Sequence, residues 1–332
     1  MSFVSEILNA VSEFRQNGFL LKEIKSYEPA EKRNELLFFF KPEILVPESV
    51  DLEKILEITQ EKFKEFEIEV ESLSIVSGEY LKKHEIMAKH YGVINRIARY
   101  GRDELMSQAL ESFKEIFGVS PEEAEILGAF QFLEKFPYFN EFSLNVLWEN
   151  LENRKLAPGT YCEKIKVGEK HVFVLNGFHP FQLYHFTRKG AFIVVMAVSS
   201  DTDWKILREK FIGATNPEKA AEGSLRRIFL EKKEELGIPV VGQGYNGVHL
   251  SAGPVEALIE LLRFCSNYEE NHILKPEDTA IGRKFLEIFD NNTLEKIMEN
   301  PKINVDGKLI SVFDLTEEMN SEEAIALLKK YF

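Results

Sequence analysis

The residues best suited to chemistry in this sequence gather around one histidine, His249. It ends a short apolar–polar segment, and a helix is predicted to begin just after it at Pro254, where the missing N–H of proline is harmless. Imidazole is a nucleophile when a carboxylate fixes one ring nitrogen and leaves the other to attack. Glu260 is placed to supply that carboxylate, with Asn246 and Ser251 as polar neighbours. Because a lone histidine is more often a core or surface residue, other motifs must decide its role.

Two motifs precede this histidine. Residues 211–217 read F-I-G-A-T-N-P, residues 222–226 read E-G-S-L-R, and residues 246–249 read N-G-V-H. In this order they resemble the signature of the nucleoside diphosphate kinase family, which runs G-x-T-N-P, P-G-(S/T)-(I/L)-R and N-x-x-H. The spacing from Thr215 to Arg226 also matches the family pattern. Three ordered blocks that lead to a histidine are more specific than any one of them.

The resemblance extends towards the N-terminus. Residues 36–40, L-L-F-F-F, predict a fully buried strand, because the apolar run is continuous and has the length of a strand. Lys41-Pro42-Glu43 follows it, where the family's first strand ends in Lys-Pro-Asp, so Lys41 would be the lysine that meets the nucleotide phosphates. Tyr91 stands where the family keeps a tyrosine near its catalytic histidine.

Two positions of the pattern have alternatives. His179-Pro180-Phe181 stands where the family has Arg-Pro-Phe, so Phe181 would stack on the base, although a core role fits it equally well. The predicted helix over residues 203–211 carries Arg208 one position away from the family's arginine. Either Arg208 or Lys210 would therefore contact phosphate.

The resemblance implies a phosphotransferase that moves the terminal phosphate of a nucleoside triphosphate to a diphosphate through a phosphohistidine. Mg²⁺ would be the cofactor, held by substrate phosphates and water without a protein metal cage. The residues implied in catalysis are His249, Glu260 and Lys41, and those implied in nucleotide binding are Lys41, Tyr91, Phe181, Arg208, Thr215, Arg226, Asn246 and Ser251.

The implied fold is α+β. It is a ferredoxin-like sandwich of four antiparallel strands with helices on one face, interrupted by a mainly helical insertion. The predicted domains are an N-terminal helical and strand extension (1–34), the first half of the kinase-like core (35–100), an inserted helical subdomain with a hairpin at Gly168-Glu169 (101–170), the second half of the core (171–267) and a C-terminal extension (268–332).

Composition sets wider limits. The chain has 332 residues, 44% of them hydrophobic and 29% charged, which is the balance of a globular protein. Its formal net charge of -14 argues against a nucleic-acid or anionic-membrane partner. Two cysteines are too few for a disulfide framework, and the longest apolar run, residues 191–198, is too short to span a bilayer. We therefore expect a soluble, cytoplasmic protein.

Departures from the family pattern leave other functions open. Leu250 and Ala252 replace the glycine and aspartate that the family has after its histidine, and Glu222 replaces a proline. These positions build the site and the subunit contacts of the family, so self-association as a homo-oligomer is left open. The main alternative to an enzyme is a nucleotide-binding regulatory or scaffold module without turnover. A plain interaction protein, which would bind no nucleotide, is the weaker alternative.

Overall fold

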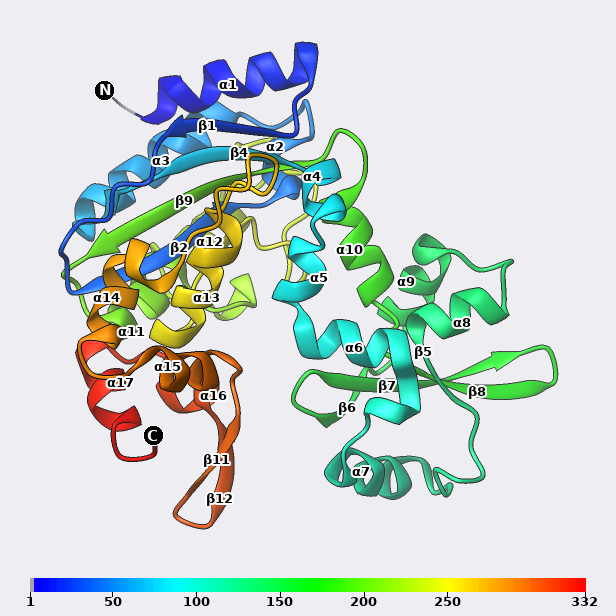
Figure 1. Ribbon diagram of the computed structural model, residues 1–332. Helices are drawn as coiled ribbons and strands as arrows, with labels where there is room; N and C mark the ends of the chain where they lie inside the picture. Colours follow the sequence, from blue (N-terminus) through cyan, green and yellow to red (C-terminus); the bar gives the residue numbers. More distant parts are fainter. Residues whose placement is uncertain (1–2) are drawn as a thin grey trace. The chain divides into compact units, whose positions relative to one another are not determined.

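The computed structural model describes residues 3–332, which divide into two compact units. One unit, here called the sheet unit, combines the residues up to Tyr80 with Lys189–Phe332. The other, the inserted unit, is formed by Leu81–Arg188 and contains the predicted insertion 101–170 (Figure 1). The chain passes from the first to the second within α4 (Gly78–Lys83).

The sheet unit is built on an antiparallel sheet with the strand order β1-β4-β9-β2-β10, and a further short strand, β3, pairs with β9. The strands are β1 (Leu21–Lys25), β2 (Asn34–Phe40), β3 (Glu69–Val70), β4 (Leu73–Ser77), β9 (Phe192–Ser200) and β10 (Val248–Leu250). The α+β class with an antiparallel sheet is thus confirmed. The predicted count of four strands is wrong, because β1 and β3 also pair with β4 and β9 and bring the sheet to six.

Helices cover both faces of this sheet, so the predicted single helical face is wrong. Every residue from Leu36 to Phe40 is fully buried, as the apolar run predicts for a strand covered on both sides. The Phe38 ring meets Phe63 of α3 (Leu52–Glu65) at 5.3 Å between centroids. Phe39 points to the other face and meets Phe264 of α13 (Pro254–Phe264) at 5.5 Å.

The remaining helices of the sheet unit connect and flank the strands. They are α1 (Phe3–Asn17), α2 (Pro42–Leu45), α11 (Trp204–Ile206), the π-helix η2 (Leu207–Ile212), η3 (Pro217–Lys219), α12 (Leu225–Glu231), η4 (Pro276–Asp278), α14 (Ala280–Leu286), α15 (Asn291–Met298), α16 (Val312–Thr316) and α17 (Ser321–Leu328). A hairpin of β11 (Lys302–Val305) and β12 (Lys308–Ser311) turns at Asp306-Gly307.

The inserted unit has a sheet of its own as well as helices. Its four strands run in the order β5-β8-β7-β6, with β5 (Ile126–Gly128), β6 (Arg154–Ala157), β7 (Thr160–Val167) and β8 (Lys170–Leu175). The predicted hairpin is confirmed, because Val167 pairs with Lys170 across Gly168-Glu169. Its helices are α5 (Ile86–His90), α6 (Gly92–Tyr100), η1 (Gly101–Glu104), α7 (Ser107–Phe117), α8 (Ala129–Lys135), α9 (Glu141–Glu149) and α10 (His179–Thr187).

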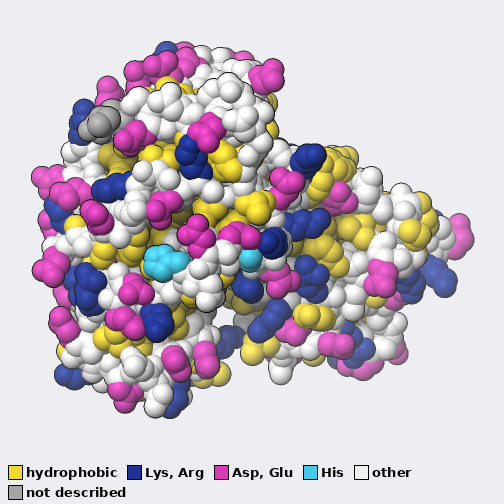
Figure 2. Space-filling view, turned by 45° about the horizontal axis from the view of Figure 1, so that its top comes forward, with side chains coloured by type: hydrophobic (Ala, Val, Ile, Leu, Met, Phe, Trp, Pro, Cys, Tyr) yellow, Lys and Arg dark blue, Asp and Glu magenta, His cyan; other side chains and the backbone are white. Residues whose placement is uncertain are grey.

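Charged side chains of both signs lie on the surface (Figure 2). Figure 2 shows acidic and basic side chains interspersed over the face in view, with hydrophobic side chains in scattered patches. Within residues 3–332, no helix combines the length and the apolar character that crossing a bilayer requires.

Two buried carboxyl groups join the start of β2 to neighbouring segments. Glu35 and Glu71 are each 2% exposed. The hydroxyl of Tyr27 and the backbone N–H of Ile281 (2.7 Å) donate to Glu35, and the N–H of Ala30 donates to Glu71 (2.7 Å). Burial, followed by the charge of Glu35, raises the pKa of Glu71 to about 8. Since two buried carboxylates repel each other, the pair keeps a proton at neutral pH.

This proton predicts how stability depends on pH. The pKa of Glu71 rises on folding from 4.5 to about 8, so its stabilising contribution is complete below pH 4.5 and is lost as pH rises to 8. The loss is on the order of 3 kcal/mol. In Glu71→Gln, which mimics the protonated carboxyl, urea unfolding should show a smaller loss between pH 5 and 8. The exposed Glu61→Gln should follow the wild type, and parallel curves for Glu71→Gln and wild type would contradict the shared proton.

Candidate functional site

His249 lies in β10, at one edge of the sheet. It pairs with Phe39 of β2, and the two rings stack with centroids 4.5 Å apart and planes 17° from parallel. Its side chain is 17% exposed, so the ring is largely packed but still open at one part. The chain then turns through residues 251–253 into α13, and this turn brings the helix back over the imidazole.

A carboxylate of α13 fixes the ring. Glu260 Oε1 lies 2.9 Å from His249 Nε2, and the Glu260 side chain is only 2% exposed. The Ser251 hydroxyl donates to Glu260 Oε2 at 2.6 Å, and it accepts the backbone N–H of Leu37 at 2.9 Å. We expected Ser251 to bind nucleotide, but its hydroxyl is fully buried and serves to hold Glu260. The arrangement makes Nε2 the nitrogen that faces the helix.

Lys41 and Asn246 meet beside this histidine. Lys41 directly follows β2 and is 9% exposed, and its Nζ donates to Asn246 Oδ1 at 2.6 Å. The Asn246 amide in turn donates to the carbonyl of Thr215 at 3.0 Å. The G-x-T-N-P loop therefore reaches the site through its backbone, whereas the Thr215 residue is exposed. Three segments that the sequence motifs singled out are joined by these two hydrogen bonds.

Two arginines complete the basic side of the site. Arg226, in α12, is 4% exposed and donates to the carbonyls of Gly213 (2.9 Å) and Val248 (3.0 Å). Arg208 donates to the carbonyl of Leu250 at 2.9 Å. The Nε atoms of both arginines are buried and have no hydrogen-bond partner within residues 3–332. Both guanidinium groups thus lie next to the backbone of β10 with N–H capacity to spare.

Arg208 lies in the π-helix η2. A π-helical turn holds more residues than an α-helical turn, and such turns are frequent at functional sites. Arg208 is half-buried at the site, whereas Lys210 of the same segment is exposed. Of the two alternatives, Arg208 is the one the structure brings to His249.

Burial and positive charge act together on the titration of the site. Burial first, and then the charges of Lys41, Arg226 and Arg208, lower the pKa of His249 well below its ordinary value. Burial also lowers the pKa of Lys41 to about 8 and that of Arg226 to about 9. The imidazole is therefore neutral at pH 7. The contacts of Lys41 and Arg226 are to neutral oxygens, so an anion entering the site would meet cations that no ion pair has neutralised.

Tyr91 and Phe181 belong to the inserted unit and take part in its aromatic packing. The Tyr91 ring lies edge-on to His179 with centroids 6.0 Å apart. Phe181 of α10 contacts Phe142 (5.1 Å) and stacks with Tyr184 (6.3 Å). Phe181 is partly buried in this aromatic packing, and its stacking on a base stays a prediction.

Comparison with known proteins adds no relative. No protein-family model matches the chain, and no curated protein is significantly similar to it. The case for a function therefore depends on the motifs and on the geometry of the sheet unit.

The sequence reasoning assigned no role to three residues that shape the site. Glu43, noted only as a departure from the family pattern, accepts the backbone N–H of Gly247 at 2.9 Å. Gly247 has φ +80, and a Cβ there would come within 2.9 Å of Phe229, so the turn that delivers His249 requires glycine. Trp204 donates its indole N–H to the carbonyl of Ser251 at 3.1 Å. A tryptophan is a weak signal in a sequence, because its partner is known only from the fold.

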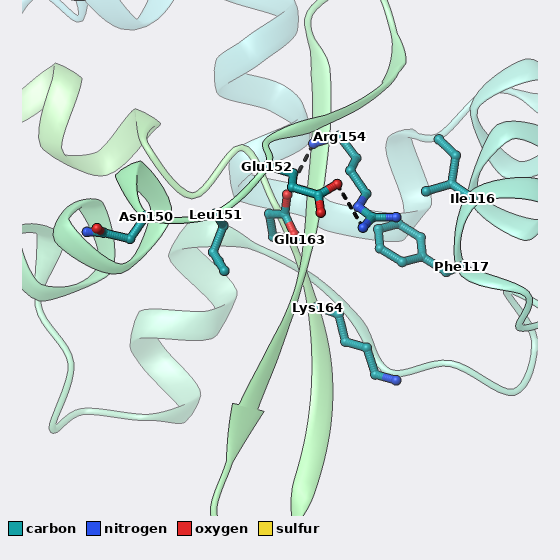
Figure 3. A pocket seen from close by; sticks show the side chains of 8 residues that line it. All are labelled: Ile116, Phe117, Asn150, Leu151, Glu152, Arg154, Glu163 and Lys164. Atoms are coloured by element: carbon teal, nitrogen blue, oxygen red, sulfur yellow. Dashed lines mark hydrogen bonds and ion pairs between the residues drawn. The ribbon is translucent and has the colours of Figure 1, made fainter.

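Two cavities are lined by residues outside the sequence motifs. One, of about 530 Å³, is lined by residues of the sheet unit such as Arg33 and Lys284. The other, of about 620 Å³, lies in the inserted unit. There the Arg154 guanidinium lies over the Phe117 ring and pairs with Glu152 at 2.8 Å (Figure 3). The cavity of the inserted unit is lined by equal numbers of acidic and basic side chains. We take the surroundings of His249, and neither cavity, as the candidate functional site because they combine an oriented imidazole with buried cations.

The basic cluster predicts stabilisation by a small polyanion. Pyrophosphate should raise the melting temperature of the wild type at low ionic strength, because it pairs with buried cations only in the folded state. At 100 times the dissociation constant the gain is about 2.7 kcal/mol, or roughly 5 to 10 °C. Scanning fluorimetry with sodium chloride at matched ionic strength is the control. Arg226→Met should lose most of the shift, and an undiminished shift in that variant would place the anion elsewhere.

Proposed function

We propose that the protein is a nucleoside diphosphate kinase-like phosphotransferase that carries the phosphate on His249. The observation that supports this most is the contact between His249 Nε2 and Glu260 Oε1 at 2.9 Å, next to three cations whose charges act on the ring. A neutral, oriented imidazole is a nucleophile, and the basic side chains would attract the phosphates of its substrate. Phosphoryl transfer needs this positioning and electrostatic stabilisation more than it needs other chemistry.

The first half-reaction would start at Nδ1 of His249. Its lone pair attacks the γ-phosphorus of the triphosphate, an N–P bond forms, and the P–O bond to the β-phosphate breaks. The electron pair of that bond stays on the departing diphosphate. The Nε2 proton remains between the ring and Glu260, whose carboxylate stabilises the positive charge that develops on the imidazole. In the second half-reaction a terminal oxygen of another diphosphate attacks the phosphorus and releases the neutral ring.

Lys41, Arg208 and Arg226 would bind the phosphate oxygens, with Asn246 holding Lys41 in place. Arginine suits this role because its planar fork binds two oxygens at once. The carboxylates near the ring already hold other groups, since Glu260 contacts His249 and Glu43 accepts from Gly247. This donor set fits magnesium that arrives on the substrate phosphates better than a metal held by the protein.

The strand order also supports the proposal. Four of the six strands, taken along the chain as β2, β4, β9 and β10, lie in the order β4-β9-β2-β10, which is the order of a ferredoxin-like sheet. On this interpretation β1 and β3 are additions, and His249 lies on the edge strand of the core. The nucleotide would reach the histidine from that edge.

A nucleotide-binding module without turnover is the second candidate. It is favoured by Leu250 and Ala252, which replace the family's glycine and aspartate, and by the fully buried Ser251 hydroxyl. In such a module the basic cluster would bind nucleotide, but the phosphate would not move to His249.

Radiolabelling tests the phosphohistidine directly. Incubation with [γ-³²P]ATP and Mg²⁺ should label the wild type with a phosphate that is lost in acid and kept in base. His249→Ala should abolish the label, whereas His171→Ala, which removes an exposed histidine of the inserted unit, should keep it. Equal labelling of wild type and His249→Ala would remove His249 from the mechanism.

Phosphate exchange between ATP and GDP separates the two candidates. An enzyme should form GTP, and Glu260→Gln should slow the exchange by about 100-fold or more, because the ring loses the charge that holds its tautomer. Calorimetry on the same samples should show that Glu260→Gln still binds ATP. Binding of ATP by the wild type without any exchange would instead establish the module without turnover.

A further inference from the structure

The C-terminal extension passes directly over the turn that follows His249. The backbone N–H of Glu318 donates to the carbonyl of Ala252 at 2.9 Å. A Cβ on Gly253 would come within 2.6 Å of the Thr316 carbonyl oxygen, so glycine is needed here for close approach rather than for its backbone angles. The segment from Thr316 to Ser321 is therefore fitted against the site and is not a separate appendage.

The same segment also forms hydrogen bonds with Trp204 and with Asn34. Asn320, which is 5% exposed, accepts the backbone N–H of Trp204 at 2.9 Å and the side-chain amide of Asn34 at 2.8 Å. The N–H of Ser321 donates to Asn34 Oδ1 at 3.0 Å. Trp204 opens the helical segment that carries Arg208, and Asn34 opens β2. The extension thus joins the start of β2, the arginine segment and the histidine turn.

One acidic side chain of this segment reaches the basic cluster. Glu317 Oε1 lies 4.0 Å from Arg208 Nη2, with side chains 50% and 17% exposed. A second carboxyl near Arg208 is that of Glu256, which accepts the N–H of Ala252 at 3.0 Å. Burial and the charge of Glu260 raise the pKa of Glu256 to about 8, so it is mostly uncharged at pH 7. Glu317 is the half-exposed carboxylate that faces Arg208.

We propose that Glu317 is a built-in counter-ion of Arg208, which the phosphate of a substrate displaces, so that the C-terminal extension sets the affinity of the site for phosphate groups. The inference rests on the proposed function for the identity of the anion. A half-exposed pair at 4.0 Å is weak, which suits a contact that must open in every binding event. A buried pair would hold Arg208 away from the substrate.

Pyrophosphate binding, measured by calorimetry at low ionic strength, tests this contact without requiring turnover. Glu317→Gln keeps the size of the side chain and removes its charge, and it should bind pyrophosphate about two- to five-fold more tightly than the wild type. Glu318→Gln, which removes the same charge one residue further along, should bind as the wild type does. In an Arg208→Ala background, Glu317→Gln should have no further effect, because the counter-ion has lost its partner.

The outcomes also separate this inference from the proposed function. In ATP/GDP exchange, Glu317→Gln should lower KM and leave kcat unchanged, whereas a general loss of folding would change both. Tighter pyrophosphate binding without any labelling of His249 would support the counter-ion and refute the kinase mechanism. Equal affinities of wild type, Glu317→Gln and Glu318→Gln, or no pyrophosphate binding by any of them, would overturn the counter-ion. So would an unchanged effect of Glu317→Gln in the Arg208→Ala background.

Discussion

The burial of two basic side chains against neutral oxygens is the constraint on which the rest of the site depends. Lys41 meets an amide oxygen and Arg226 meets two backbone carbonyls, while both lie almost wholly out of solvent. Buried charge of this kind is unfavourable unless other groups support it. The support comes from the ends of β2 and β10, which fix the oxygens in place. Burial first, and then the positive charge of these side chains, keeps the imidazole beside them neutral, and the site as a whole favours an anion.

The parts of this arrangement that the sequence predicts are those with a local signal. A continuous apolar run predicts β2, Pro254 predicts the start of α13, and Gly168-Glu169 predicts the turn of the β7–β8 hairpin. The added strand β1 and the helices on the second face have no such signal, because they depend on which segments meet in three dimensions. A continuous apolar run predicts only that a strand is buried on both faces. It does not say that α3 covers one face and α13 the other.

The site divides in the same way. Motif spacing found His249, Glu260, Lys41, Arg226 and Asn246, and the structure brings all five together in the sheet unit. Motif spacing did not predict the hydrogen-bond partners of these residues, such as the carbonyl of Val248 for Arg226. Every residue has a backbone carbonyl, so the sequence does not indicate which carbonyl is the partner. In the inserted unit, a matching position in the motif does not reveal the surroundings of the side chain. His179 matches a family arginine by position, yet it is fully buried, and its ring nitrogens lie within hydrogen-bond distance of the side chains of Gln182 and Asn95.

The hydrogen bonds of Ser251 show why the fold and the chemistry cannot be separated here. One hydroxyl joins the N–H of β2 to the carboxylate of α13, so the helix is aligned by the same atom that aligns Glu260 on His249. Movement of α13 would therefore shift the carboxylate relative to the ring, and the electrostatic contact between them, now at 2.9 Å, weakens as the two groups separate. The C-terminal segment reinforces the same turn from the outside through Ala252. The helix side of the site is held by these hydrogen bonds, whereas Arg208 on the basic side is more exposed than Arg226. Arg208 is therefore the side chain that can exchange an internal carboxylate for an incoming phosphate.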